Sequence, residues 1–112
     1  MANTSDNLYN AALAVTTLTT IYTPASNEVG KSLWLTLTNT TTTTNTVDVY
    51  IYNGVSDILI EKIRVPRGNG RVAVCSKLSG HSVSGGGGQL VKVQLSSATN
   101  INVVLSGVRE TS

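Results

Sequence analysis

The feature that most constrains the fold is a pair of alternating runs at residues 31–54, KSLWLTLTNTTTTTNTVDVYIYNG. Aliphatic residues alternate with polar or aromatic ones in both runs: Leu33, Leu35 and Leu37 with Trp34, Thr36 and Thr38, and Val47, Val49 and Ile51 with Asp48, Tyr50 and Tyr52. Successive side chains of a strand point to opposite faces, so this pattern predicts two strands that each have one aliphatic face. We interpret the stretch as an antiparallel hairpin whose aliphatic face a second sheet must cover.

The composition supports an all-β chain of one domain. A chain of 112 residues is long enough for a single core. Hydrophobic residues make up 40% and aromatic residues 4%, and phenylalanine is absent, so the core must consist of Val, Leu and Ile, which favour strands. Charged residues make up only 12%, which suits a surface that contacts other proteins. With a net charge of +2, no strong attraction to nucleic acid or to a membrane is expected.

The remaining segments also read as strands separated by Gly, Pro and Asn turns. We expect strands at residues 17–23, 57–65, 71–75, 89–95 and 101–108, with the last two closing as a hairpin. A change of phase at Glu61-Lys62 predicts a β-bulge where the second of these, at residues 57–65, crosses between sheets. The sequence therefore predicts an antiparallel β-sandwich or jelly-roll-like domain at residues 17–112, preceded by an N-terminal arm at residues 1–16.

The arm has neither helical periodicity nor clean alternation, and we expect a short helical turn or an edge strand there. Its apolar residues Leu8, Tyr9 and Leu13 need a place to be buried. Either they pack along their own domain, as tethered termini commonly do, or they dock on a neighbouring protein.

Residue chemistry gives no catalytic, metal or cofactor site. The single histidine, His81, lies in GHSVS, where the last position of a nucleophile elbow would be glycine. The carboxylates show no metal-ligand spacing, and Gly85 to Gly88 lack the lysine of a phosphate loop. Cys75, the single cysteine, is expected as a small hydrophobe in a strand. No signal sequence or membrane span is recognisable, which indicates synthesis in a cytoplasm.

Two groups of residues are candidates for an interface. Trp34, Tyr50 and Tyr52 are expected to share the outer face of the central hairpin, where they could bind a protein, stack on a sugar or merely stabilise the sheet. Arg64, Arg67 and Arg71 flank one turn, as a solvated loop or as an anchor for carboxylates of a partner.

The chain also resembles small β-sandwich cement or decoration proteins, the capsid "staple" proteins, of tailed bacteriophages. The likeness lies in residues 20–24 (TIYTP), 35–40 (LTLTNT), 47–51 (VDVYI) and 101–108 (INVVLSGV), in an order that covers about residues 17 to 109. The segment GHSVSGGGGQ at residues 80–89 departs from the compact glycine-acid turn of that family.

The resemblance implies a non-catalytic virion protein, made in the host cytoplasm, that sits on the outer capsid surface. Its partners would be the major capsid protein and further copies of itself, as a dimer or trimer, with no nucleic acid, membrane, small-molecule substrate or cofactor. The alternative is a neck, tail or receptor- or carbohydrate-binding appendage module of a phage virion.

Overall fold

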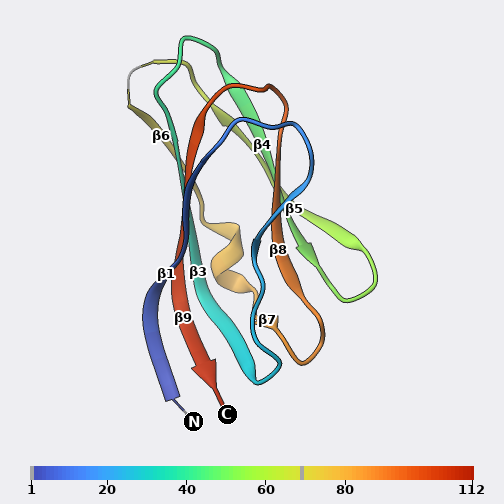
Figure 1. Ribbon diagram of the computed structural model, residues 1–112. Coiled ribbons are helices and arrows are strands. Elements are labelled where there is room, and N and C mark those ends of the chain that lie inside the picture. The colour runs from blue at the N-terminus through green and yellow to red at the C-terminus, as the bar shows by residue number, and fades with distance from the viewer. Residues whose placement is uncertain (1, 69) are drawn as a thin grey trace.

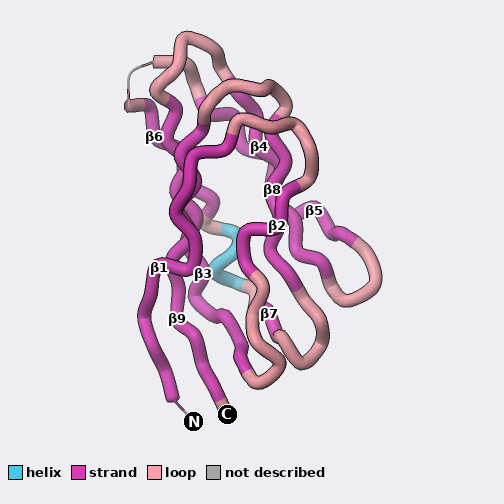
Figure 2. The backbone as a smooth tube through the Cα atoms, viewed as in Figure 1, coloured by secondary structure: helices cyan, strands magenta, loops and turns pink. Residues whose placement is uncertain are grey.

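The protein is a sandwich of two antiparallel sheets (Figure 1). The computed structural model describes residues 2–68 and 70–112. The first sheet has the order β1 (Ala2–Leu13), β9 (Ile101–Thr111), β3 (Glu28–Asn39), β6 (Arg71–Cys75), and β7 (Val83–Ser84) also pairs with β3. The second sheet has the order β2 (Thr19–Tyr22), β8 (Leu90–Leu95), β4 (Asn45–Tyr52), β5 (Asp57–Val65). A 3-10 turn, η1 (Lys77–Gly80), is the short helical segment in Figure 2, and it buries Leu78.

The core lies between the sheets and consists of the alternating aliphatic residues. Leu33, Leu35 and Leu37 of β3 are fully buried, and so are Val47 and Val49 of β4, while the residues between them point outward. This burial pattern confirms the predicted antiparallel β-sandwich, and it confirms Cys75 as a buried strand residue.

Both predicted hairpins are wrong, however, because their strands lie in opposite sheets. β3 pairs with β6, β7 and β9, whereas β4 pairs with β5 and β8. The connections 40–44 and 96–100 are therefore arches from one layer to the other. Alternation shows that one face of a strand is buried, but two strands of one sheet and two strands facing each other across a core give the same pattern.

Two buried asparagines hold the first arch in place. Asn39, fully buried at its start, donates from Nδ2 to the carbonyl oxygens of Thr43 (2.8 Å) and Val65 (3.2 Å). Asn45, at its end, donates from Nδ2 to the carbonyl oxygen of Ser97 (2.9 Å) in the second arch. These bonds satisfy carbonyl groups that the turn away from the sheet leaves without a strand partner.

The predicted arm contains β1, an edge strand that pairs with β9 from Ala2 to Leu13. An edge strand was one of its two expected structures. Leu8, Tyr9 and Leu13 are partly buried and pack against the core of their own domain.

Strand β5 has the predicted bounds but belongs to one sheet throughout. Val49 pairs with Glu61 and Tyr50 with Leu59, so the bulge is present with Ile60 as its extra residue, not at Glu61-Lys62. The chain crosses between sheets in the turn after Val65, because β6 pairs with β3 in the other layer. Ile58 of this strand is 45% exposed because the β4–β5 hairpin stands out from the sandwich (Figure 1).

Candidate binding surfaces

The two outer faces of the sandwich differ in chemistry. We call one part of the outer side of the first sheet the uncharged face, which excludes the ion pair between Lys31 and Glu110 in the same sheet. It is formed by outward residues of β1, β9, β3 and β6, which share one side because they stand opposite each other in the register: Asn10, Ala12, Asn102, Val104, Ser106, Trp34, Thr36, Thr38, Val72 and Val74. None of these ten residues is ionisable.

Large apolar side chains are exposed on the uncharged face. Trp34 is 45% exposed, Val72 57% and Val74 39%. A bulge at Ser32-Leu33 precedes the tryptophan, and Ser32 has a φ of 51°. Opposite this bulge stands Gly107, where a Cβ would lie 2.8 Å from Leu33 Cδ2. Leu33 can thus turn into the core, and the next residue, Trp34, points outward.

The outer side of the second sheet, which we call the charged face, carries ion pairs between strands, one joining the neighbours β4 and β5 and one reaching from β8 across β4 to β5. Lys62 Nζ lies 2.9 Å from Asp48 Oδ1, and Lys92 Nζ lies 3.0 Å from Asp57 Oδ1. Partly exposed pairs of this kind are well hydrated, and they add little to stability. This face therefore has the character of an ordinary solvated surface.

The aromatic residues predicted to share one face are divided between the two. Tyr50 and Tyr52 lie on β4 in the charged face, whereas Trp34 lies on β3 in the opposite sheet. This part of the prediction is wrong because it depended on the central hairpin. Lys92 Nζ also lies 4.7 Å from the centroid of the Tyr52 ring, so this ring contacts a cation of its own sheet.

The predicted arginines come together at one end of the sandwich. Arg64 lies near the end of β5, Arg67 lies in the turn that follows and Arg71 begins β6, and all three are exposed. In Figure 1 this end is at the top, opposite the two termini.

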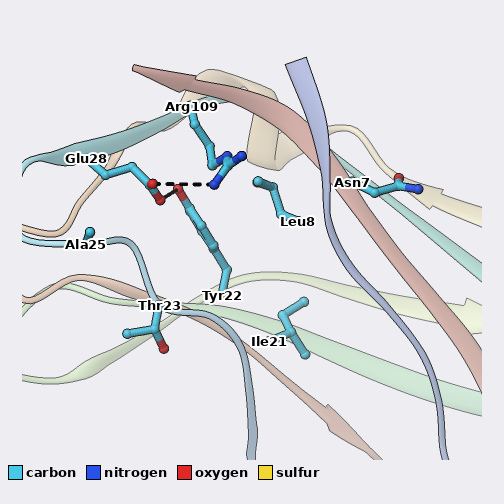
Figure 3. Close-up of a pocket in the computed structure, with 8 residues that line it drawn as sticks. All are labelled: Asn7, Leu8, Ile21, Tyr22, Thr23, Ala25, Glu28 and Arg109. Carbon is cyan, nitrogen blue, oxygen red and sulfur yellow. Dashed lines mark hydrogen bonds and ion pairs between the residues drawn. The ribbon is translucent and has the colours of Figure 1, made fainter. Parts of the chain in front are cut away.

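A polar cluster that was not predicted from the sequence is drawn in Figure 3, and it lies near the C-terminus because Glu28 stands opposite Thr111. It borders a pocket of about 310 Å³ and joins β2, β3 and β9. Tyr22 Oη donates to Glu28 Oε2 at 2.7 Å, and Arg109 Nη1 lies 3.8 Å from Glu28 Oε1. Burial, and next the bond to Glu28, raise the pKa of Tyr22 well above its usual value. Alternation could not reveal it, because counting from Leu33, Leu35 and Leu37 places Glu28 on the outer side, and only the bulge at Ser32-Leu33 turns it inward.

A second buried polar contact lies between the sheets. Burial and then the carboxylate of Glu61 raise the pKa of the Cys75 thiol to about 11. Glu61 Oε1 is itself buried without a hydrogen-bond partner among the described residues.

His81 follows η1 as an exposed loop residue, as expected. Within residues 2–68 and 70–112, no group of three or more His, Cys, Asp or Glu side chains is placed to hold a metal ion. In the same ranges, no helix has the length and hydropathy needed to cross a membrane.

A solved structure that is similar to this chain shares the fold. It is a Bacillus protein described in the words "Bacillus endospore appendages form a novel family of disulfide-linked pili", with a TM-score of 0.52 and 18% sequence identity over 97% of this chain and 88% of that chain. No protein-family model and no curated protein matches the sequence. At this identity the likeness establishes a common β-sandwich fold.

Proposed function

We propose that the chain is a non-catalytic structural subunit that binds other proteins of an assembled particle through its uncharged face. More specifically, we propose that the chain is a decoration protein on the outer capsid of a tailed bacteriophage, where it binds the major capsid protein and further copies of itself. A neck, tail or receptor-binding appendage module is the second candidate.

The observation that carries the proposal is the contrast between the two faces. The uncharged face combines an exposed tryptophan, Trp34, with Val72 and Val74 and with threonine and asparagine, whereas the other face has cross-strand ion pairs. Protein interfaces are depleted in charge at their centre and enriched in tryptophan, and most interface energy comes from a few such residues. The face without charges is therefore the better candidate for contact.

The second candidate draws its support from the shared fold, since the similar structure is described as belonging to appendages that are pili. This chain is poorly suited to the disulfide links that the description names. Cys75 is the single cysteine of this chain, and it is fully buried in β6. Contact through the uncharged face requires no such link.

Purified particles that contain the protein would separate the two candidates. Cryo-electron microscopy should find copies distributed over the shell if the protein is a decoration protein, and at one vertex or along a tail if it is an appendage module. Absence of the protein from assembled particles would contradict both.

A pair of variants tests the surface itself. Trp34→Ala should weaken binding to shells by about 2 kcal/mol, as for an interface hot spot. Tyr50→Ala, which removes a partly buried ring from the charged face, should bind as the unaltered protein does. Equal binding by all three proteins in a co-sedimentation assay would exclude the uncharged face.

A further inference from the structure

A second site is formed at the arginine-bearing end of the sandwich, by residues remote from Trp34. A cleft of about 490 Å³ lies between the first arch and the turn that joins β5 to β6. Threonines line one wall and the turn lines the other: Thr40, Thr41, Thr42, Arg67 and Gly68. The cleft thus lies between a threonine wall and a wall that contains an arginine.

Hydrogen bonds fix both walls before any ligand arrives. The Gly68 amide donates to the carbonyl oxygen of Thr41 at 3.0 Å, and the Arg67 amide donates to Thr44 Oγ1 at 3.1 Å. The buried Asn39 accepts from the amide (2.9 Å) and the hydroxyl (2.8 Å) of Thr41. Ordering these loops on ligand binding would therefore cost little free energy.

A second arginine adjoins the same turn. The side chain of Arg71 lies over Gly68, where a Cβ would be 2.9 Å from Arg71 Cγ and 3.1 Å from its Nε. This glycine has a φ of 137°, so both its conformation and its lack of a side chain favour the arrangement. Arg71 is thus held beside the wall that carries Arg67.

The connections at this end of the molecule contain no carboxylate. The connections at residues 14–18, 40–44, 66–68 and 96–100, which Figure 1 shows together at the top, contain no Asp or Glu. Arg64, Arg67 and Arg71 form no ion pair with another described residue. Elsewhere on the surface the lysines Lys31, Lys62 and Lys92 each pair with a carboxylate.

We propose that this cleft binds carboxylate side chains of an acidic segment of a partner protein. Arginine binds carboxylates through paired N–H groups, and the hydroxyls of Thr40 and Thr42 can donate to the same oxygens. A nucleic acid fits less well, because single strands need aromatic side chains on which bases stack, and Trp34 and Tyr50 lie on the outer faces. The site is distinct from the uncharged face, so it extends the proposed function without depending on it.

Nuclear magnetic resonance with the isotope-labelled full chain tests the proposal. A capped oligoglutamate peptide should shift the amide signals of Thr40, Thr41, Thr42, Arg67 and Gly68, and saturate. Arg67→Gln and Arg71→Gln should each weaken this binding about tenfold, as expected for loss of a charge-assisted hydrogen bond. The matched control is Lys77→Gln, which removes one positive charge from an exposed residue of η1 and should leave the affinity unchanged.

Three results would overturn the proposal. The first is an absence of shifts at the cleft, and the second is an equal loss of affinity in the Lys77→Gln control, which would reveal only general charge attraction. The third is tighter binding of an oligothymidylate than of oligoglutamate at the same amides, which would assign the cleft to nucleic acid. None of these results bears on Trp34, so the proposed function is judged separately by its own variants.

Discussion

The hydroxyl of Tyr22 in β2 donates a 2.7 Å hydrogen bond to the carboxylate of Glu28 in β3, so this pair joins the two sheets. Glu28 is only 8% exposed, and Arg109 of β9 lies on the other side of its carboxylate. A buried charge is tolerated when hydrogen bonds and an opposite charge compensate its loss of water. The cluster is thus a structural link at this end of the sandwich.

Removing the carboxylate should destabilise the fold. Glu28→Ala leaves a buried tyrosine hydroxyl without its acceptor and is expected to lower the free energy of unfolding by about 2 to 3 kcal/mol in urea denaturation. Glu110→Ala is the control, because it also breaks an ion pair between β3 and β9, with Lys31 at 3.1 Å, but the lysine side chain is 44% exposed. It should cost less than about 1 kcal/mol. Equal losses in the two variants would contradict the structural role of Glu28.

Gly30 should be intolerant of even one added methyl group. An alanine Cβ there would lie 2.5 Å from Tyr22 Cε2 and 2.9 Å from Tyr22 Oη, and the ring is held by Glu28. Gly30→Ala is expected to lower the free energy of unfolding by about 2 kcal/mol, measured in urea. Gly80→Ala, where no atom lies within 4 Å of the new Cβ, should stay within about 0.5 kcal/mol.

A double variant separates this clash from a general loss of β3 structure. Tyr22→Leu removes the ring, so adding Gly30→Ala to it should cost much less than Gly30→Ala alone. Additive losses would show that the methyl group acts by another route.

Stability should decline at alkaline pH because of Cys75. Burial, and then the nearby Glu61 carboxylate, raise the pKa of this thiol from 9.0 to about 11. Between these values the unfolded chain releases a proton that the folded chain keeps, so the free energy of unfolding falls as pH rises. The protonated thiol makes its full contribution to the free energy of unfolding below about pH 9, and about 2 kcal/mol of this free energy is lost by pH 11. Urea denaturation at a series of pH values measures this decline.

Cys75→Ala removes the thiol and should flatten the curve between those values. Tyr22, whose pKa burial also raises, begins to contribute only above about pH 10. If the free energy of unfolding of Cys75→Ala falls by the same amount at alkaline pH, the decline is due to Tyr22 or to other groups.

The strand positions could be predicted closely from the sequence because alternation and turn residues are local signals. Strands β5 and β6 have the predicted bounds, Asp57–Val65 and Arg71–Cys75. The pairing of the strands could not be predicted from these local signals, since it depends on which layer each strand joins. Asn39 and Asn45 offered a clue, because two asparagines in phase with buried positions indicate a tight, hydrogen-bonded turn out of the sheet.

The candidate surface was predictable only in part for the same reason. Trp34 could be named as an outward residue from alternation alone. Val72 and Val74 could not be joined to it, because this requires knowing that β6 pairs beside β3. The separation of Trp34 from Tyr50 likewise follows from the arch at residues 40–44, which places β3 and β4 in different layers.

Charge introduced on the uncharged face should disrupt binding without unfolding the protein. Val72 is 57% exposed on the edge strand β6, so Val72→Lys loses little buried surface and should change the free energy of unfolding by less than about 1 kcal/mol. In an interface, however, the new ammonium group would lose its water without gaining a partner, and affinity for the particle should fall at least tenfold, by about 1.4 kcal/mol or more. Leu59→Lys, a similar change at a residue that is 48% exposed in the other sheet, is the control. Co-sedimentation with particles measures both variants, and equal binding by the two would place the contact elsewhere on the molecule.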